Sequence, residues 1–280
     1  MNIKEAAAFL LGKASRRNRG RRNFIRLARL QERKMHAAVQ EWMDEMVKTL
    51  QAGLSRMRGK GPAAKAKSIA DWKAIEARGI EIMKPAIFEA LAAGGQSVMS
   101  QRPVRKQQRF DIIGVEAVKW AEKHSAELVV EISEKTMLAI REYIKRGVDA
   151  GKGVPEIARE LRPLVGLHEK QIMAVANYHE MLILERPEYT AAQQKAMADT
   201  YARRLHRDRT ALIARTETSF ALSEGVREGY DQMGITHLER VEDPDCCDEC
   251  KDGDGKVYTI EEAQGVLPAH PGCEGAWVMA

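Results

Sequence analysis

The chain has 280 residues and a formal net charge of +5, and only 5% of its residues are aromatic while 30% are charged. This composition favours helices over a β-sandwich or a β-barrel. No apolar run approaches the ~20 residues that a membrane-spanning helix needs, and the N-terminus shows no secretory signal pattern. We therefore expect no membrane partner and a cytosol-like compartment.

The first part of the chain is strongly basic. Residues 1–40 contain 11 Lys and Arg but only two acidic residues, so the positive charge belongs to this end of the chain. Residues 1–34 are interpreted as a basic arm that binds DNA phosphates or an acidic protein surface, with a solvated tail as the alternative. The candidate binding residues are Arg16, Arg17, Arg19, Arg21 and Arg22.

Apolar residues recur every three or four positions after this arm, which predicts long helices. Residues 35–57 are expected to form one helix and residues 68–91 a second. Pro85 should kink the second helix, and Gly94 and Gly95 should end or weaken it.

The same periodicity continues through the middle of the chain. The expected helices span residues 115–144, 155–161, 168–184 and 190–233. Thr190 and Gln193 resemble a capping box at the start of the last helix, and Gly234 is a suitable residue to follow its end. That helix is long for a globular protein, so we expect a break near Asp208.

The character of the sequence changes after Gly234, where short β-prone pieces replace the helical pattern. The predicted fold class is mainly α, with several long helices followed by a small C-terminal α+β module of the zinc-knuckle type. The predicted regions are a basic arm at 1–34, a helical region of unknown role at 35–114, a helical core at 115–234 and the knuckle module at 235–280.

All four cysteines lie in this last region. Cys247 and Cys250 are separated by two residues, and His270 and Cys273 repeat that spacing 19 residues later. Two such chelating pairs, giving three thiolates and one imidazole, are typical of a closed structural zinc site. Cys246 leaves a second choice of first ligand open, because a Cys-x3-Cys pair can also chelate an ion.

A closed set of four ligands leaves no coordination position for a reactive water. The sequence has no His-Glu-x-x-His motif, and the order of its His and Cys pairs is the reverse of that in zinc deaminases. We therefore expect structural zinc, no catalytic residues and no enzyme activity.

Two stretches together carry a resemblance to a known family. They are Ile213-Ala-Arg-Thr-Glu-Thr218 in the last long helix, and the module with Cys247-x2-Cys250 and His270-Pro-Gly-Cys273. This arrangement resembles the phage Mu F-like head morphogenesis family over roughly residues 115–280. The family pattern usually ends with a further Cys after the His-Pro-x-Cys, which this chain lacks, and often has Thr where this chain has Cys246.

The resemblance implies a minor structural head protein of a tailed phage or prophage. Its implied partners are the portal protein, the major capsid protein and packaged double-stranded DNA. Its implied location is the head interior or portal vertex of the virion, with the host cytoplasm as its location during assembly. The alternative function is a zinc-containing DNA-binding or nuclease-like protein with a basic N-terminal arm.

Arg215 and Glu217 lie inside the first of these motifs. Neither has an opposite charge three or four residues away on its own helix, so local ion pairs do not explain them. We hypothesise that both side chains form hydrogen bonds that dock the knuckle on the helix, with a solvated helical face as the alternative.

Overall fold

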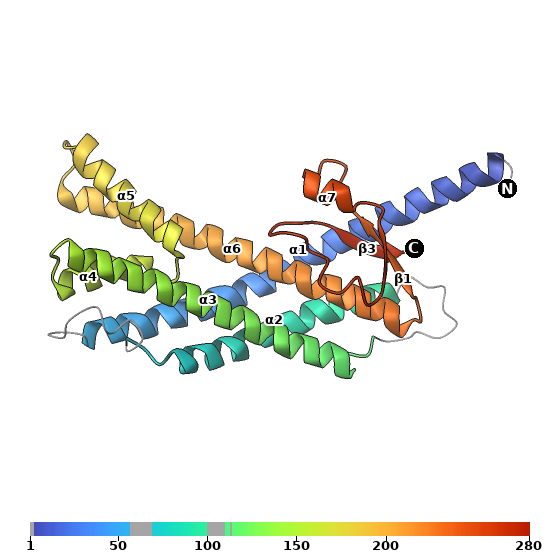
Figure 1. The fold of residues 1–280 in the computed structure, drawn as a ribbon, viewed down its shortest axis with the longest axis horizontal. Helices are drawn as coiled ribbons and strands as arrows, with labels where there is room; N and C mark the ends of the chain where they lie inside the picture. The colour runs from blue at the N-terminus through green and yellow to red at the C-terminus, as the bar shows by residue number, and fades with distance from the viewer. Residues whose placement is uncertain (1–2, 57–68, 100–109, 113) are drawn as a thin grey trace. The chain divides into compact units, whose positions relative to one another are not determined.

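The computed structural model describes residues 3–56, 69–99, 110–112 and 114–280 (Figure 1). These residues form seven α-helices, one short 3-10 helix and three strands. Long helices come first along the chain, and the small sheet follows them near the C-terminus. This order confirms the predicted fold class. None of the helices in the described ranges is long and apolar enough to cross a membrane.

Helix boundaries differ from the predicted ones mainly at the N-terminus. The helices are α1 (Ile3–Arg56), α2 (Trp72–Met99), α3 (Val115–Asp149), α4 (Val154–Leu161), the 3-10 helix η2 (Arg162–Leu164), α5 (Glu169–Glu185), α6 (Ala191–Gln232) and α7 (Asp248–Gly253). The basic arm and the apolar helix after it are one continuous helix, α1. The two glycines of the arm, Gly12 and Gly20, each cost only ~1 kcal/mol inside a helix and do not break it. The break expected near Asp208 is likewise absent from α6.

The expected end of α2 at Gly94 and Gly95 is wrong, since the helix continues to Met99. The two glycines serve close packing instead. A Cβ atom on Gly94 would lie 2.4 Å from the carbonyl oxygen of Leu222 in α6, and one on Gly225 would lie 2.0 Å from that of Leu91. Glycine is therefore required here because the backbones of α2 and α6 approach each other closely.

Helix α6 has the predicted residues at both its start and its end. The Thr190 amide donates to Gln193 Oε1 at 2.8 Å, and the Gln193 amide donates to Thr190 Oγ1 at 3.3 Å. These reciprocal bonds satisfy amides that the first turn of α6 leaves without helical partners. Gly234, with φ of 72°, follows the end of α6 as predicted.

The chain folds into two compact units, each assembled from separate stretches of sequence. Unit 1 comprises residues 1–38, 83–124 and 212–280, and unit 2 comprises residues 39–82 and 125–211. Unit 2 has a helical core that includes the fully buried Trp42, whose indole nitrogen donates to the carbonyl of Ile75 at 3.3 Å. The sequence suggested consecutive regions, because periodicity within a helix does not reveal which distant helices pack together.

The sheet belongs to unit 1. Its strands are β1 (His237–Val241), β2 (Val257–Thr259) and β3 (Ala276–Met279), in the order β2-β1-β3 with both pairings antiparallel. Leu238 pairs with Tyr258 on one side and with Met279 on the other. The buried side chains of the sheet and its loops form one apolar cluster with Val98 of α2 and Val226 and Tyr230 of α6. This cluster fixes the loops that carry the cysteines.

Candidate metal centre

The fold of the C-terminal module places the four predicted ligands in two overlapping groups that share Cys250. Cys247 precedes the first residue of α7, and Cys250 lies within that helix. His270 and Cys273 lie in the loop that leads to β3. Because β3 pairs with β1, the end of that loop returns to the segment that begins α7.

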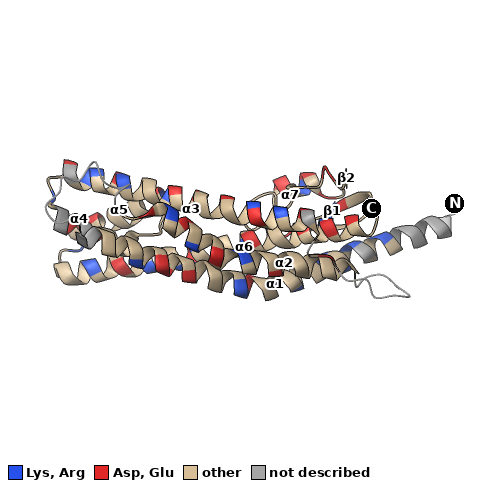
Figure 2. Ribbon diagram, turned by 90° about the horizontal axis from the view of Figure 1, so that it is seen from below, with Lys and Arg blue, Asp and Glu red and all other residues tan. Residues whose placement is uncertain are grey.

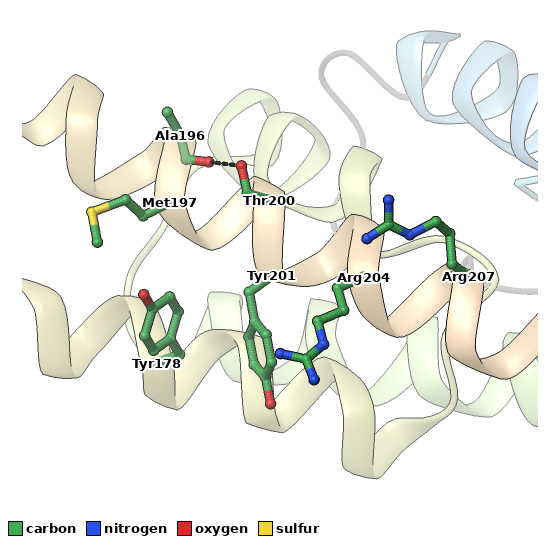
Figure 3. A pocket seen from close by; sticks show the side chains of 7 residues that line it. All are labelled: Tyr178, Ala196, Met197, Thr200, Tyr201, Arg204 and Arg207. Carbon is green, nitrogen blue, oxygen red and sulfur yellow. Dashed lines mark hydrogen bonds between the residues drawn. The ribbon is translucent and has the colours of Figure 1, made fainter.

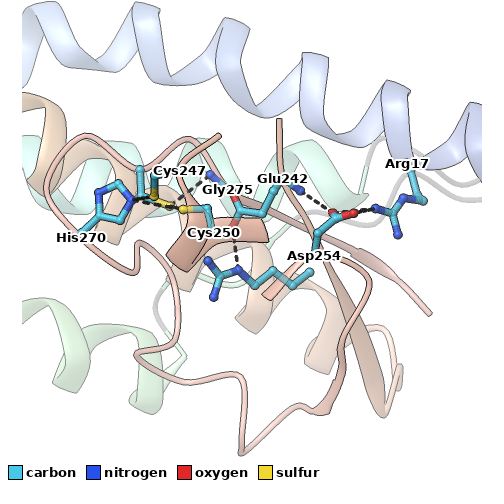
Figure 4. Close-up of polar contacts among 9 residues, drawn as sticks. Arg17, Glu242, Cys247, Cys250, Asp254, His270 and Gly275 are labelled. Carbon is cyan, nitrogen blue, oxygen red and sulfur yellow. Dashed lines mark hydrogen bonds and ion pairs between the residues drawn. The ribbon is translucent and has the colours of Figure 1, made fainter. Parts of the chain in front are cut away.

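The donor atoms of Cys247, Cys250 and His270 lie close to one another (Figure 4). The Nε2 atom of His270 is 3.2 Å from Cys247 Sγ and 3.1 Å from Cys250 Sγ, and Cys250 Sγ is 3.6 Å from Cys273 Sγ. Cys247, Cys250 and His270 form one group that can hold a metal ion, and Cys250 and Cys273 form a second with Glu242. Cys250 is common to both groups.

The Cys250–Cys273 separation of 3.6 Å fits a tetrahedral metal ion, whereas the two separations from His270 Nε2, 3.2 and 3.1 Å, are a few tenths of an ångström shorter than such an ion requires. Bonds of ~2.3 Å to sulfur and ~2.0 Å to nitrogen place neighbouring ligand atoms roughly 3.5 to 3.8 Å apart. The His270 Nδ1–H donates to the carbonyl of Pro271 at 3.0 Å, which leaves the Nε2 lone pair facing the thiols. Such a bond fixes the tautomer and orientation of a metal-binding imidazole. Cys247, Cys250 and His270 can therefore hold a metal ion, and Cys273 lies beside Cys250.

The local charges differ from one ligand to the next. The backbone amide of Cys250 lowers the pKa of the Cys247 thiol, and burial raises the pKa of the Cys250 thiol. The hydrogen bond to the Pro271 carbonyl raises the pKa of His270. A metal ion entering this set has to displace protons, and Cys250 holds its proton more firmly than Cys247 does.

The structure separates the two adjacent cysteines. Cys247 belongs to the metal-competent group, whereas Cys246 packs against the apolar cluster of the module and is in neither group. The geometry therefore favours the pair separated by two residues, Cys247 and Cys250, as the first half of the set.

Sequence reasoning missed two buried charges beside the thiols. The Glu242 carboxylate accepts from Arg240 Nε at 2.5 Å, and both side chains are at least nine-tenths buried. Asp245 and Asp248, which flank the two adjacent cysteines in the sequence, are exposed instead. The only feature of the sequence that could have pointed to the pair of Glu242 and Arg240 is that both residues lie in a β-prone segment. Charged residues in such a segment are ordinarily assigned to its solvent-exposed side.

Comparison with known families decides the relationship. Residues 139–277 match the family described as Phage Mu protein F like protein. The chain belongs to this family through those residues. This family is one of phage head morphogenesis proteins, as the resemblance of the sequence implied. Searches among curated proteins and among solved structures gave no match.

Helix α1 precedes the matched residues, yet it lies against the C-terminal module that carries the candidate metal ligands. We call this module, residues 235–280, the metal module. Three basic residues of α1 form the contact, one per helical turn, and we call them the docked face: Lys13, Arg17 and Arg21. Arg17 pairs with Glu239 and also donates to both carboxylate oxygens of Asp254, at 2.6 and 2.7 Å. Lys13 lies 3.0 Å from Glu239. These contacts attach the helix directly to the module.

The docked face is linked to the metal centre by hydrogen bonds. Asp254, which receives Arg17, also accepts from the backbone amide of Glu242 at 2.8 Å (Figure 4). Glu242 is in turn grouped with Cys250 and Cys273. Arg21 completes the docked face through Asp243 and through Glu274, 3.6 Å away.

The predicted DNA-binding arginines therefore divide into different environments. Arg17 and Arg21 are held in ion pairs within the chain. Arg19 and Arg22 are exposed and have no carboxylate partner among the residues that the structure describes. The side chain of Arg16 lies outside the described part of the molecule.

Arg215 and Glu217 contact other helices. Arg215 lies 3.5 Å from Glu32 of α1, and Glu217 accepts a hydrogen bond from Nε2 of His124 in α3 at 2.7 Å. His124 is stacked on Trp120. Neither partner belongs to the C-terminal module, so no contact in the described ranges supports the hypothesised docking role.

Unit 2 has an open hollow of about 590 Å³ beside α5 and α6 (Figure 3). Tyr178 of α5 and Tyr201 of α6 meet edge to face in it, with ring centroids 5.1 Å apart. Arg204 and Arg207 also line it, and no carboxylate, thiol or imidazole is among its lining residues. It therefore offers neither metal ligands nor an acid–base pair.

Proposed function

We propose that this chain is a minor structural head protein of a tailed phage or prophage, assembled with the portal protein and the major capsid protein. The observation that carries the proposal is the family match over residues 139–277, which contains α5, α6 and the metal module. The virion head is accordingly its proposed location, and the host cytoplasm its location before assembly.

The metal in this proposal is zinc, and its role is structural. Three thiols and one imidazole are the donors of a common closed zinc set. Cys250 and Cys273 are buried, and Cys250 belongs to the apolar cluster that joins the module to α2 and α6. An ion bound there would connect α7 to the loop before β3, and so stabilise the fold of the module.

The chain is proposed to have no enzyme activity. Cys247, Cys250, His270 and Cys273 would fill all four positions of a tetrahedral ion and leave none for a substrate. The neighbouring carboxylate, Glu242, is paired with Arg240, which argues for a role in stabilising the module.

The basic part of α1 supports a further component of the proposal, an association with packaged double-stranded DNA. Exposed arginines on this helix provide the positive charge that phosphate binding requires.

The test is co-assembly. The full chain carrying an affinity tag is expressed with the portal and capsid proteins of the same genome, and heads are purified on a density gradient. We expect the chain to migrate with the heads and to contain about one zinc ion per copy by elemental mass spectrometry. Heads of normal composition that exclude the chain would overturn the assembly role, and a chain isolated without bound metal would overturn the zinc role.

A further inference from the structure

A second basic surface of α1 points away from the metal module. Four arginines lie on it at spacings of four, three and four residues, which places them along one side of the helix. We call this set the arginine stripe: Arg22, Arg26, Arg29 and Arg33. All four are exposed, and they line a shallow hollow of about 460 Å³ together with Ile25 and Leu30.

The charges of the arginine stripe are not neutralised by neighbouring acids. Arg22 Nε donates to the carbonyl of Asn18 at 3.2 Å, and Arg26 donates to Asn23 Oδ1 at 3.1 Å. Both acceptors are uncharged groups of α1 itself. Within the described ranges, no carboxylate oxygen forms an ion pair with any of the four guanidinium groups, and Glu32 faces Arg215.

The docked face of the same helix provides the contrast. Lys13, Arg17 and Arg21 each have a carboxylate partner in the module. The fold therefore pairs the charges on one basic side of α1 with carboxylates of the same chain and leaves the charges on the other side exposed to solvent. Basic residues follow one another along the described N-terminal part of this helix (Figure 2).

We propose that the arginine stripe binds the sugar–phosphate backbone of double-stranded DNA. The inference rests on the proposed function, because a head protein that meets packaged DNA needs such a surface. It also changes the predicted binding set: the surface extends from Arg22 to Arg33, while Arg17 and Arg21 hold the metal module.

The dimensions favour duplex DNA. The stripe rises over 11 residues, which is roughly 16 Å of helix at ~1.5 Å per residue. A duplex carries one phosphate charge per ~1.7 Å, so about ten phosphates fall within that length. Guanidinium groups bind phosphate oxygens in a bidentate manner, which suits an all-arginine stripe.

The apolar content of the hollow argues against a membrane surface. Leu30 is 54% exposed and Ile25 is half-buried, so the stripe offers one prominent apolar side chain. Interfacial helices present a broad apolar face instead. The binding is expected to be independent of sequence, because contacts to phosphates carry no base information.

The experiment compares two sets of substitutions in the full chain. One variant replaces the stripe by R22Q, R26Q, R29Q and R33Q, and the matched control replaces the docked face by K13Q, R17Q and R21Q. Glutamine preserves helix propensity, so both variants should keep α1. Fluorescence anisotropy with a 30-base-pair duplex gives the dissociation constant between 50 and 300 mM salt.

We expect the stripe variant to lose most of its affinity. The slope of log K against log salt should fall in magnitude by ~0.9 for each lost phosphate contact, hence by about three to four. The docked-face variant should keep the slope of the unmodified chain. Equal losses of DNA affinity in both variants would overturn the stripe as the binding surface. The affinity would then depend only on the number of positive charges and not on which face carries them.

A second measurement needs no variant and so does not depend on folding. Arginines of the unmodified chain are modified with phenylglyoxal, with and without duplex DNA, and are mapped by peptide mass spectrometry. DNA should protect Arg22, Arg26, Arg29 and Arg33. Equal modification with and without DNA would overturn the proposal, and so would protection by poly-glutamate or anionic vesicles at concentrations where DNA gives none.

Incorporation into heads separates this inference from the proposed function. If the stripe variant enters heads normally but the unmodified chain shows no DNA binding, the DNA surface is wrong while the assembly role stands. If the unmodified chain binds DNA through the stripe but is absent from heads, the assembly role is wrong.

Discussion

The two basic faces of α1 consist of similar residues but differ in their surroundings. On the docked face, Arg17 bridges Glu239 and Asp254 of the metal module. On the arginine stripe, Arg29 and Arg33 are exposed to solvent. The difference shows that the local density of positive charge does not decide what a basic helix binds. What decides it is which carboxylates the rest of the fold places against each face.

Removal of the proposed zinc ion should have the largest effect, and it should affect the docked face but not the arginine stripe. Structural zinc contributes apparent binding energies of ~10–16 kcal/mol in small zinc modules, comparable with the whole stability of a domain. Chelation, or Cys250→Ser, should therefore unfold residues 235–280 and release the docked face, while the helix that carries the arginine stripe persists. Hydrogen exchange followed by mass spectrometry would show fast exchange in the module.

Cys246→Ser is the matched control for this prediction, because Cys246 packs against the apolar cluster and is in neither metal-competent group. It should retain one metal ion by native mass spectrometry. Metal loss in this variant equal to that in the Cys250 variant would contradict the assignment of ligands.

Neutralising one docked arginine should have the next largest effect. Arg17→Gln leaves Glu239, whose side chain is only 2% exposed, without its guanidinium partner. The expected destabilisation is about 1–3 kcal/mol, since Arg17 is itself partly exposed and the pair is partly screened. Urea denaturation followed by intrinsic tryptophan fluorescence, to which Trp277 of the module contributes, would measure it.

Arg33→Gln removes the same charge from the arginine stripe. Surface substitutions of this kind change the free energy of unfolding by less than about 0.5 kcal/mol. If both variants lose the same stability, the ion pairs of the docked face do not hold the module.

A smaller change in stability is expected from substitutions at an uncharged contact between α1 and the sheet. A Cβ atom on Gly20 would lie 2.4 Å from Cγ1 of Val278, while one on Gly12 would meet nothing within 4 Å. Gly12→Ala should gain up to ~1 kcal/mol of helix stability. Gly20→Ala gains the same propensity but loses about 1 kcal/mol or more through overpacking.

Thermal unfolding of the two glycine variants, monitored by circular dichroism, gives the comparison. A transition temperature for Gly20→Ala that rises as much as that of Gly12→Ala would show that α1 and the module are not in contact at this position.

The smallest expected effect is a change of stability with pH. It should come from unit 2 and should involve neither the docked face nor the arginine stripe. Burial lowers the pKa of His206 in unit 2, whose Nε2–H donates to the Pro163 carbonyl at 3.0 Å. A histidine with a lowered pKa contributes stability that is complete above its ordinary pKa of ~6.5 and is lost as the pH falls below it. Lys and Arg keep their charge over this range.

Denaturation at pH 7.5 and pH 5.5 would measure this contribution. His206→Gln should reduce the loss of stability on acidification. Part of that loss should remain in the variant, because burial also lowers the pKa of His168. An unchanged pH dependence in the variant would mean that His206 is not a source of the acid sensitivity.

Periodicity and ligand spacing predicted much of this molecule. The helices from 115 to 233, the caps at Thr190 and Gly234, and the change of structure after residue 234 follow from local chemistry, which the sequence records directly. The pairing of Cys247 with Cys250 was also accessible, because two residues of separation already bring two thiols together.

The remaining features depend on distant contacts. Gly94 suggested a helix end, yet the helix continues because α6 approaches it at that point. Glu242 and Arg240 suggested a solvated strand, yet they are buried beside the thiols. Arg17 and Arg22 are alike in sequence context, and only the position of the module distinguishes them.

The contacts of Arg17 also constrain the order in which the protein forms. Its partners Glu239 and Asp254 follow it by 222 and 237 residues along the chain. At a synthesis rate of ~5–20 residues per second, roughly 10–45 s pass before these carboxylates leave the ribosome. During that interval both basic faces of the nascent helix are unpaired and available to the nucleic acids around it, and completion of the C-terminal module withdraws one face from them.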